Sequence, residues 1–214
     1  MAMEMKKRNW TMSLVQEEKS ASPVRKQVGL LGGTFNPVHI THLIAADQVG
    51  RGLGLEKVSL MPSFTPPHVD EKPTIASAHR LQMLKLAIQD NPLLDIEEIE
   101  LERGGTSYTY ETIIALKEKN PETDYYFIIG GDMVEYLPKW HRIDELMEII
   151  QFVGIHRPGY PQETIYPIIW VDVPLMEISS TMIRQKVAQG CSIRYFVPEQ
   201  VSHYIHEEGL YLND

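Results

Sequence analysis

The stretch Leu30–Val49, LLGGTFNPVHITHLIAADQV, leaves a short apolar run, turns through two glycines and a proline, and enters a helical pattern. Two glycines directly after a strand allow the backbone to turn tightly and to approach a ligand closely. His39 and His42 lie three residues apart, so they share a face in the first turn of the predicted helix. The stretch therefore predicts a strand, a ligand-binding turn and a helix in direct succession.

The ligand expected at this turn is a phosphate group. A helix N-terminus carries partial positive charge and unpaired N–H groups, and two imidazoles add further donors. Neither G-x-x-x-x-G-K-[ST] nor G-x-G-x-x-G follows the strand, which excludes a Walker-type loop and the dinucleotide-binding loop of dehydrogenases. Metal binding by His39 and His42 is the weaker alternative, because no third ligand falls nearby with suitable spacing.

The rest of the chain alternates short apolar runs with longer periodic ones, which favours an α/β fold. Strands are predicted within residues 27–32, 57–62, 93–102, 124–132, 151–159 and 166–174. Helices are predicted within residues 40–53, 77–92, 107–121, 141–150, 178–190 and 197–211, the second with Ser77 as its N-cap. We expect a single Rossmann-like domain whose parallel sheet is covered by helices on both faces. Ligands of such sheets bind beyond the carboxyl ends of the strands.

The composition is that of a globular protein from a reducing compartment. Of 214 residues, 43% are hydrophobic and 23% are charged. A formal net charge of −9 argues against non-specific nucleic-acid binding without excluding an anionic small ligand. The single cysteine, Cys191, excludes a disulfide framework or a Cys-based zinc site within one chain.

The first residues carry mixed charge and lack the apolar core of a signal peptide, and no apolar run approaches the length of a membrane helix. We therefore expect a mobile extension over residues 1–23, a folded domain over residues 24–214 and a cytoplasmic location.

A second constellation, ISSTMIR at residues 178–184, places three hydroxyl residues at a helix start. One of them is expected to cap the helix. Arg184 lies four residues after Ser180, one turn along the same face. Hydroxyls, N–H groups and a guanidinium that converge in this way predict a clamp for a polyphosphate.

The two constellations together, GGTFNPVHITH and ISSTMIR, resemble the nucleotidyltransferase superfamily that carries an HxGH motif after its first strand and an ISSTxxR motif late in the chain. Further segments are similar to the bacterial nicotinate-nucleotide adenylyltransferase family. These are MPSFTPPH, HRLQMLKLAI, SYTYET, FIIGGDMVEYLPKWHRIDEL, RPGY and VDVPLMEISSTMIR. The resemblance covers nearly the whole chain, from residue 24 to residue 211.

The resemblance implies an enzyme that transfers AMP from ATP to nicotinate mononucleotide, giving nicotinate adenine dinucleotide and pyrophosphate in NAD biosynthesis. It also implies Mg²⁺ bound together with ATP, with no metal ligands from the protein. The substrate phosphate attacks the α-phosphorus of ATP directly, without a covalent intermediate. The expected partners are therefore ATP and nicotinate mononucleotide, with no nucleic acid and no membrane, and a homodimer is left open.

By the same resemblance, His39 and His42 hold the ATP phosphates, His42 stabilises the transition state, and Arg184 grips the leaving pyrophosphate. Nucleotidyl transfer needs such in-line positioning and charge neutralisation more than a protein nucleophile. The residues expected at ATP are Gly32, Gly33, Thr34, Phe35, His39, His42, Asp132, Arg157, Ser180, Thr181 and Arg184.

For the acceptor, Trp140 matches the aromatic residue against which the family places the nicotinate ring. Tyr108 and Thr109 match the segment that meets the nicotinate carboxylate. A carboxylate only accepts hydrogen bonds, so donors at this segment would separate the acid from the amide. His68 and Lys72 are candidate partners of the mononucleotide.

Two positions depart from the family pattern. Thr41 stands where the HxGH motif has glycine, and its β-branched side chain narrows the space beside the phosphates. Val69 stands where close relatives have lysine, a natural phosphate partner. Two alternatives therefore stay open. One is transfer to another acceptor, such as nicotinamide mononucleotide, and the other is a nucleotide-binding protein of the same fold without turnover.

Overall fold

Consecutive residues of the strands enter two different hydrophobic clusters, so both faces of the sheet are covered. Leu31, Leu60 and Ile128 belong to one cluster, whereas Leu30 and Met61 belong to the other. Side chains of a strand alternate between the two faces of its sheet. Burial on both faces explains why these strands read as continuous apolar runs in the sequence.

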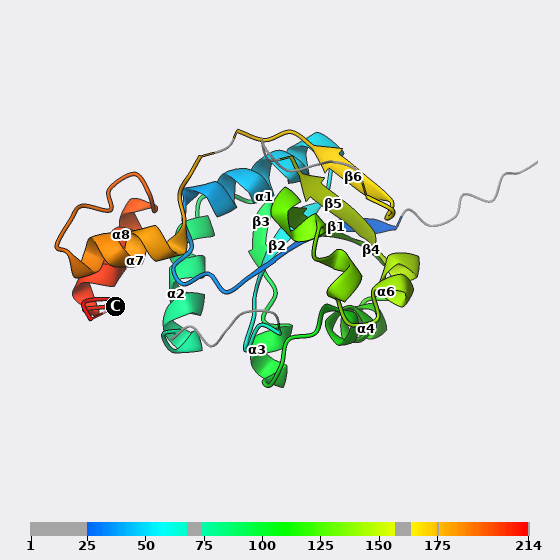
Figure 1. Cartoon of the computed structure of the whole chain (residues 1–214), viewed down its shortest axis with the longest axis horizontal. Coiled ribbons are helices and arrows are strands. Elements are labelled where there is room, and N and C mark those ends of the chain that lie inside the picture. Colours follow the sequence, from blue (N-terminus) through cyan, green and yellow to red (C-terminus); the bar gives the residue numbers. More distant parts are fainter. Residues whose placement is uncertain (1–24, 68–73, 157–163, 175, 214) are drawn as a thin grey trace, which may run out of the picture.

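The computed structural model describes residues 25–67, 74–156, 164–174 and 176–213. Within these ranges a six-stranded sheet runs through the molecule, with helices on both sides of it (Figure 1). Its strands are β1 (Lys26–Gly33), β2 (Lys57–Pro62), β3 (Leu94–Ile96), β4 (Thr123–Gly130), β5 (Gln151–Ile155) and β6 (Ile168–Val171).

The helices that accompany the sheet differ widely in length. They are α1 (Ile40–Leu53), α2 (Ser77–Ile88), α3 (Ile99–Arg103), α4 (Thr109–Lys119), α5 (Gly131–Val134), the 3-10 turn η1 (Leu137–Lys139), α6 (Ile143–Ile149), α7 (Ser180–Ala188) and α8 (Glu199–Glu207).

The strand order is β3-β2-β1-β4-β5-β6, and every pair of neighbours is parallel. The predicted α/β fold with a parallel sheet is therefore confirmed. The chain builds outward from β1 to β3 and then crosses over to begin the other half at β4. The order reverses between β1 and β4, which is where ligands bind in doubly wound sheets.

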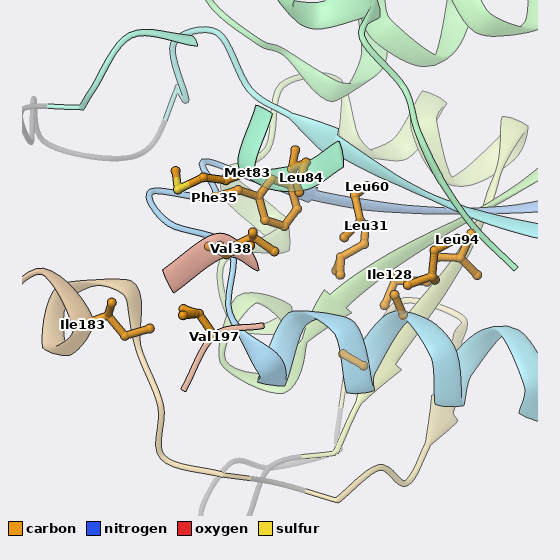
Figure 2. Packing of buried hydrophobic residues seen from close by; sticks show 14 of the residues in the cluster. Leu31, Phe35, Val38, Leu60, Met83, Leu84, Leu94, Ile128, Ile183 and Val197 are labelled. Carbon is orange, nitrogen blue, oxygen red and sulfur yellow. The ribbon is translucent and has the colours of Figure 1, made fainter. Parts of the chain in front are cut away.

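The first cluster joins the sheet to α1, α2 and the C-terminal helices. Figure 2 shows Phe35, Met83 and Leu84 gathered next to the strand residues Leu31 and Leu60. Full burial of one such side chain stabilises the fold by about 1.5–3 kcal/mol. The turn after β1 is therefore anchored in the core through Phe35, which is only 2% exposed.

Helix α1 approaches β2 closely because Gly50 has no side chain. A Cβ atom placed on Gly50 would lie 2.7 Å from Cγ2 of Val58 and 3.0 Å from Cδ2 of Leu93. Val58 is fully buried in the core and has no room to retreat, so a larger residue would push the helix away from the sheet.

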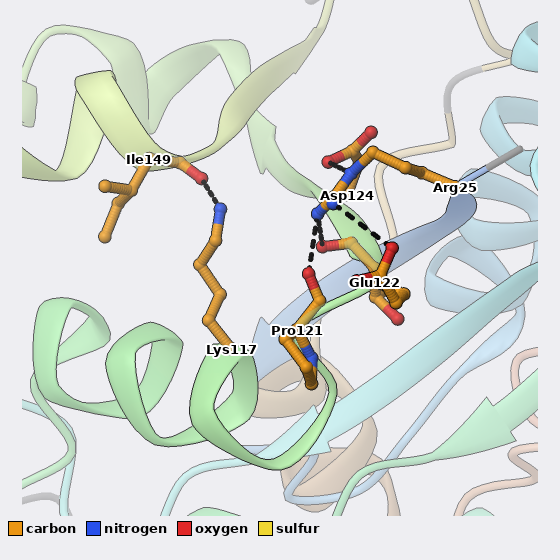
Figure 3. Close-up of polar contacts among 7 residues, drawn as sticks. Arg25, Lys117, Pro121, Glu122, Asp124 and Ile149 are labelled. Carbon is orange, nitrogen blue, oxygen red and sulfur yellow. Dashed lines mark hydrogen bonds and ion pairs between the residues drawn. The ribbon is translucent and has the colours of Figure 1, made fainter. Parts of the chain in front are cut away.

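Polar contacts stabilise the sheet at the amino ends of its central strands, on the side away from the turn that follows β1. Arg25 Nε donates to Asp124 Oδ1 at 2.8 Å, and its Nη2 donates to the Pro121 carbonyl oxygen at 2.8 Å (Figure 3). On the neighbouring helices, Lys117 donates to the carbonyl oxygen of Ile149 at 2.5 Å. These contacts stabilise the fold at the amino ends of the strands and leave the carboxyl ends available for a ligand.

Some predicted elements differ from the structure. The stretch 93–102, predicted as one strand, contains only the short edge strand β3, followed by the helix α3. The alternation of Ile and Glu in this stretch does not mark a sheet face, because Glu100 itself is buried against α4. Ser77 is not an N-cap: Ala76 holds that position, and no side chain caps the helix there.

The helix predicted within 197–211 ends at Glu207, and turns follow it. None of the helices in the described ranges is both long and apolar enough to cross a membrane. The extension predicted at residues 1–23, and the domain start at residue 24, lie outside the described residues.

Candidate active site

A cavity of about 500 Å³ opens at the carboxyl ends of β1 and β4, where the strand order reverses. Its wall includes Gly32 and Gly33 from β1 and the segment Ile128–Gly130 from β4. A volume of this size is ordinary for a pocket that binds a small ligand or cofactor. The cavity lies where the sequence predicted a ligand.

The two histidines of the turn stack face to face at the start of α1. Their ring centroids are 3.7 Å apart, and both residues line the cavity. The backbone N–H of His39 donates to Nδ1 of His42 at 3.2 Å. Because Nδ1 accepts this bond, the neutral His42 ring carries its proton on Nε2, which makes Nε2 a donor. The ring edge of Phe35 packs against His42 at a centroid distance of 5.0 Å and restricts its rotation.

The start of α1 offers fewer N–H groups than the sequence suggested. Ile40, the first helical residue, donates its N–H to the carbonyl oxygen of Phe196 at 2.9 Å. His39 donates its own N–H to His42. Many of the hydrogen-bond donors that an anion would meet at the start of α1 are therefore on the imidazole rings of His39 and His42.

The C-terminal third of the chain holds the turn in place. Ser180 Oγ donates to the Pro37 carbonyl oxygen at 2.8 Å, and Arg184 Nη1 donates to the Asn36 carbonyl oxygen at 3.0 Å. Tyr211 donates its hydroxyl proton to Asn36 Oδ1 at 2.9 Å. The sequence reasoning missed Asn36 and Tyr211, because nothing local marks a contact between residues so far apart.

The ISSTMIR segment meets the turn as predicted, but its hydroxyls differ in role. Ser179 is the N-cap of α7, since its side chain accepts from the N–H of Met182 at 3.2 Å. Ser179 and Ser180 both line the cavity, whereas Thr181 is exposed and does not. Ser179 keeps its hydroxyl proton for another acceptor and is a candidate donor that the sequence reasoning did not single out.

Asp132 lines the cavity from the first turn of α5, beside the end of β4. A Cβ atom on Gly130 would lie 2.5 Å from Asp132 Oδ1. The missing side chain at Gly130 is therefore what allows this carboxylate to lie over the end of the strand.

Trp140 also lines the cavity and is anchored by two other aromatic rings. Its ring stands edge-to-face with Phe127 at a centroid distance of 5.8 Å and with Phe152 at 5.9 Å. Pairs of this geometry add about 0.5–1.5 kcal/mol beyond simple burial. The indole is thus a rigid apolar surface against which a flat ring could stack.

Tyr108 and Thr109 line the same part of the cavity at the start of α4, where Tyr108 is the N-cap. The Tyr108 ring lies 5.0 Å from the His141 ring, and His141 Nε2 lies 3.1 Å from Glu111 Oε1. The first N–H groups of a helix have no acceptor inside it, so this start can receive an anionic group.

The structure brings together most of the predicted site residues. Those that line the cavity are Gly32, Gly33, Thr34, His39, His42, Tyr108, Thr109, Asp132, Trp140 and Ser180. Phe35 lies beneath the turn in the core, and Arg184 holds the turn from outside the wall. His68, Lys72 and Arg157, together with Val69, lie outside the described residues. Thr41 also lines the cavity, between the two histidines.

The wall also contains residues for which the sequence predicts no ligand contact, including Ser63, Pro66, Pro67, Glu100 and Ser107. In the described part of the chain, no three His, Cys, Asp or Glu side chains are grouped so that they could hold a metal ion.

Comparison with known proteins agrees with this geometry. The sequence model of the cytidylyltransferase-like family matches residues 30–186, which include both motifs. A protein of Enterococcus faecalis named "Probable nicotinate-nucleotide adenylyltransferase" is 69% identical over 201 residues, covering 94% of this chain and 92% of that protein. The chain belongs to the nicotinate-nucleotide adenylyltransferase family. The family expected from the motifs is confirmed, and with it the class of enzyme, a nucleotidyltransferase.

Other members of the nicotinate-nucleotide adenylyltransferase family match over similar lengths. One from Streptococcus pneumoniae, also named "Probable nicotinate-nucleotide adenylyltransferase", is 63% identical over 187 residues, covering 87% of this chain and 90% of that protein. Among solved structures, the Plasmodium falciparum nicotinic acid mononucleotide adenylyltransferase complexed with NaAD has a TM-score of 0.76 at 18% identity, covering 89% of this chain and 99% of that one. At that identity the likeness concerns the fold.

Proposed function

We propose that this chain transfers the adenylyl group of ATP to nicotinate mononucleotide, releasing nicotinate adenine dinucleotide and pyrophosphate as a step of NAD biosynthesis. The names of its close relatives support this reaction. A protein of the same fold is described as a complex with NaAD, the product expected here.

The observation that carries the proposal is the shared cavity at the switch in strand order. The phosphate-binding candidates His39, His42 and Ser180 line it together with Trp140 and Thr109, the candidates for the acceptor. Direct transfer between two bound substrates requires both in one chamber, with the reacting atoms about 3–3.5 Å apart.

In the proposed reaction, a phosphate oxygen of the mononucleotide attacks the α-phosphorus of ATP. A new P–O bond forms, the bond from the α-phosphorus to the oxygen shared with the β-phosphorus breaks, and that oxygen leaves with pyrophosphate. His42 donates from Nε2 to the α-phosphate, where negative charge increases in the transition state. His39, stacked on it, supports the same phosphate group.

The leaving pyrophosphate is assigned to the start of α7. Ser179 provides a hydroxyl donor at the cavity wall, and the first N–H groups of the helix add donors, whereas the Ser180 hydroxyl donates to Pro37 and holds the helix start in place. Arg184 keeps the α7 start against the turn and adds positive charge nearby. Gly32, Gly33, Thr34 and Asp132 would contact the rest of ATP. Thr181, Phe35 and Arg157 stay proposed ATP-site residues from the resemblance alone.

The acceptor is assigned to the side of the cavity formed by Trp140, Tyr108 and Thr109. The nicotinate ring stacks on the indole, and its carboxylate accepts from N–H groups at the start of α4. The amide of nicotinamide presents an NH₂ group to those donors, which leaves hydrogen bonds unmade and disfavours the amide.

Mg²⁺ is proposed to arrive with ATP, because hard triphosphate oxygens are its preferred ligands and the described residues offer no cluster for a resident ion. When bound, it neutralises charge on the phosphate oxygens. We propose a cytoplasmic location, since ATP and a reduced Cys191 both fit that compartment.

The test is pyrophosphate release from ATP and Mg²⁺ with nicotinate mononucleotide or with its amide as acceptor. Release with the acid and little with the amide is the expected result. Equal or greater release with the amide would overturn the assigned acceptor. Binding of ATP without release from either acceptor would identify a nucleotide-binding protein without turnover.

A further inference from the structure

Glu100 is a buried carboxyl group in the cavity wall to which the reaction above assigns no role. It lies on α3, it is only 4% exposed, and it lines the cavity beside Ser107. Burial raises the pKa of Glu100, since the charged form is poorly solvated there. A carboxyl group in such a place is unfavourable unless donors surround it.

Hydroxyl donors from α4 and from the segment just before it lie at this carboxyl group. The Thr112 hydroxyl, in the first turn of α4, donates to Glu100 Oε1 at 2.9 Å. Arg103 Nη2 donates to the same hydroxyl at 2.8 Å and so directs its proton toward Glu100. The carbonyl oxygen of Tyr108 lies 3.0 Å from that hydroxyl, but a carboxylate is the stronger acceptor for a single proton.

Ser107 completes the arrangement on the other side of the carboxyl group. Its hydroxyl is a second hydrogen-bond partner that lowers the pKa of Glu100, against the larger effect of burial. The same hydroxyl oxygen accepts from the N–H of Phe64 at 3.0 Å, and the N–H of Ser107 donates to the Thr65 carbonyl oxygen at 2.8 Å. The segment after β2 is therefore tied to the segment before α4 at the mouth of the cavity.

Ser107 and Thr112 flank Tyr108 and Thr109, the residues assigned to the acceptor. We propose that Glu100 is a positioning residue for the acceptor mononucleotide, because it holds these two hydroxyls and thereby fixes the start of α4 against the cavity. The inference rests on the proposed function. It concerns the acceptor side, since the hydrogen-bond partners Thr112 and Ser107 both lie at the start of α4.

The experiment compares Glu100→Gln with Glu102→Gln, an exposed neighbour on the same helix, and with the wild type. Glutamine keeps the size of the side chain but presents an NH₂ group to hydroxyls that now donate. We expect the KM for nicotinate mononucleotide to rise about tenfold, the size expected from losing one hydrogen bond to a charged group, with the KM for ATP changed less than about twofold. Glu102→Gln should leave both KM values unchanged.

Ser107→Ala is the second variant, in case Glu100→Gln does not fold. It removes one donor to Glu100 without a change in charge, and it should shift the same KM by a smaller factor. The preference for the acid over the amide should fall in both variants, because that preference depends on exact placement of the α4 donors.

Equal changes in the two KM values, or a drop in kcat with both KM values unchanged, would show a merely structural role and overturn the inference. If the variants give such a result but the wild type releases pyrophosphate with nicotinate mononucleotide, only the role of Glu100 is overturned, and the proposed function is retained. A wild type without this activity overturns both.

Discussion

The hydroxyl of Ser180 donates a hydrogen bond of 2.8 Å to the carbonyl oxygen of Pro37, 143 residues earlier in the chain. This bond brings the start of α7 onto the turn that follows β1. The two motifs recognised separately in the sequence therefore form one wall, and any movement of α7 is transmitted to the histidine turn.

His42→Ala should lower kcat by about 10²–10³-fold, the usual loss when one preorganised donor to a developing charge is removed. His42 lines the cavity and is only partly buried, so the melting temperature should change little. His203→Ala is the matched control, since that side chain is 67% exposed on α8. Near-normal turnover of the His42 variant would refute its assigned role.

Arg80→Met should weaken both the fold and ATP binding. Arg80 is 2% exposed and its Nη1 donates to the carbonyl oxygens of Thr34 and Ser63, each at 2.8 Å. Burial lowers the pKa of Arg80. Methionine would leave two carbonyl oxygens without their donor, and this cost exceeds the gain from removing a buried charge. We therefore expect the free energy of unfolding, measured in urea, to fall by about 1–3 kcal/mol.

Because Thr34 lines the cavity, Arg80→Met should also raise the KM for ATP more than the KM for the mononucleotide. Lys85→Met on the same helix, where Lys85 makes an exposed ion pair with Glu98, should change neither KM. An unchanged KM for ATP in a folded Arg80 variant would mean that Arg80 stabilises the core but does not contribute to ATP binding.

Trp140→Ala should raise the KM for nicotinate mononucleotide more than that for ATP, since the indole is the proposed stacking surface. Loss of its contacts with Phe127 and Phe152 should also lower the free energy of unfolding by about 0.5–3 kcal/mol, less than for a fully buried ring because Trp140 is only partly buried. Trp140→Phe retains a flat ring and should recover much of both losses. Equal effects on the two KM values would place the nicotinate ring elsewhere.

Gly130→Ala should impair ATP binding with little loss of stability. The new Cβ would meet Asp132 Oδ1 at 2.5 Å, and this carboxylate is the end of a flexible side chain that can move away. The KM for ATP should rise if Asp132 contacts the nucleotide. Gly52→Ala is the control, because its Cβ meets only Val171 at 3.9 Å and should stabilise α1 by about 0.5–1 kcal/mol.

The raised pKa of Glu100 makes its contribution to stability depend on pH. The folded state holds the proton more tightly than the unfolded state, whose reference pKa is 4.5. The contribution is therefore fully present below that pKa and is lost as pH rises through the higher pKa of the folded state. Urea unfolding of the wild type and of Glu100→Gln across this range should show the wild type losing stability relative to the variant. If the difference in free energy of unfolding between the two proteins did not change with pH, the raised pKa of Glu100 would be contradicted.

Much of the fold follows from local patterns. The helix 40–53 and the strand 57–62 have the bounds that the sequence predicts, because their periodicity and flanking glycine and proline are local signals. The stretch 93–102 misled the prediction. Its alternation resembles a strand, but burial of Glu100 under Thr112 selects a helix there, and that contact lies outside any local window.

The candidate site divides in the same way. The strand, the glycine turn, the paired histidines and the capped ISSTMIR helix can all be predicted from local sequence, since each depends on neighbours within one or two turns. The contacts that hold these segments together are visible only in the folded molecule. Three contacts illustrate this: Tyr211 bonds to Asn36, Arg80 to Thr34, and Glu100 to Thr112. They form only when the sheet and its helices pack and bring distant segments together. The spacing of residues in the sequence does not show which segments will meet.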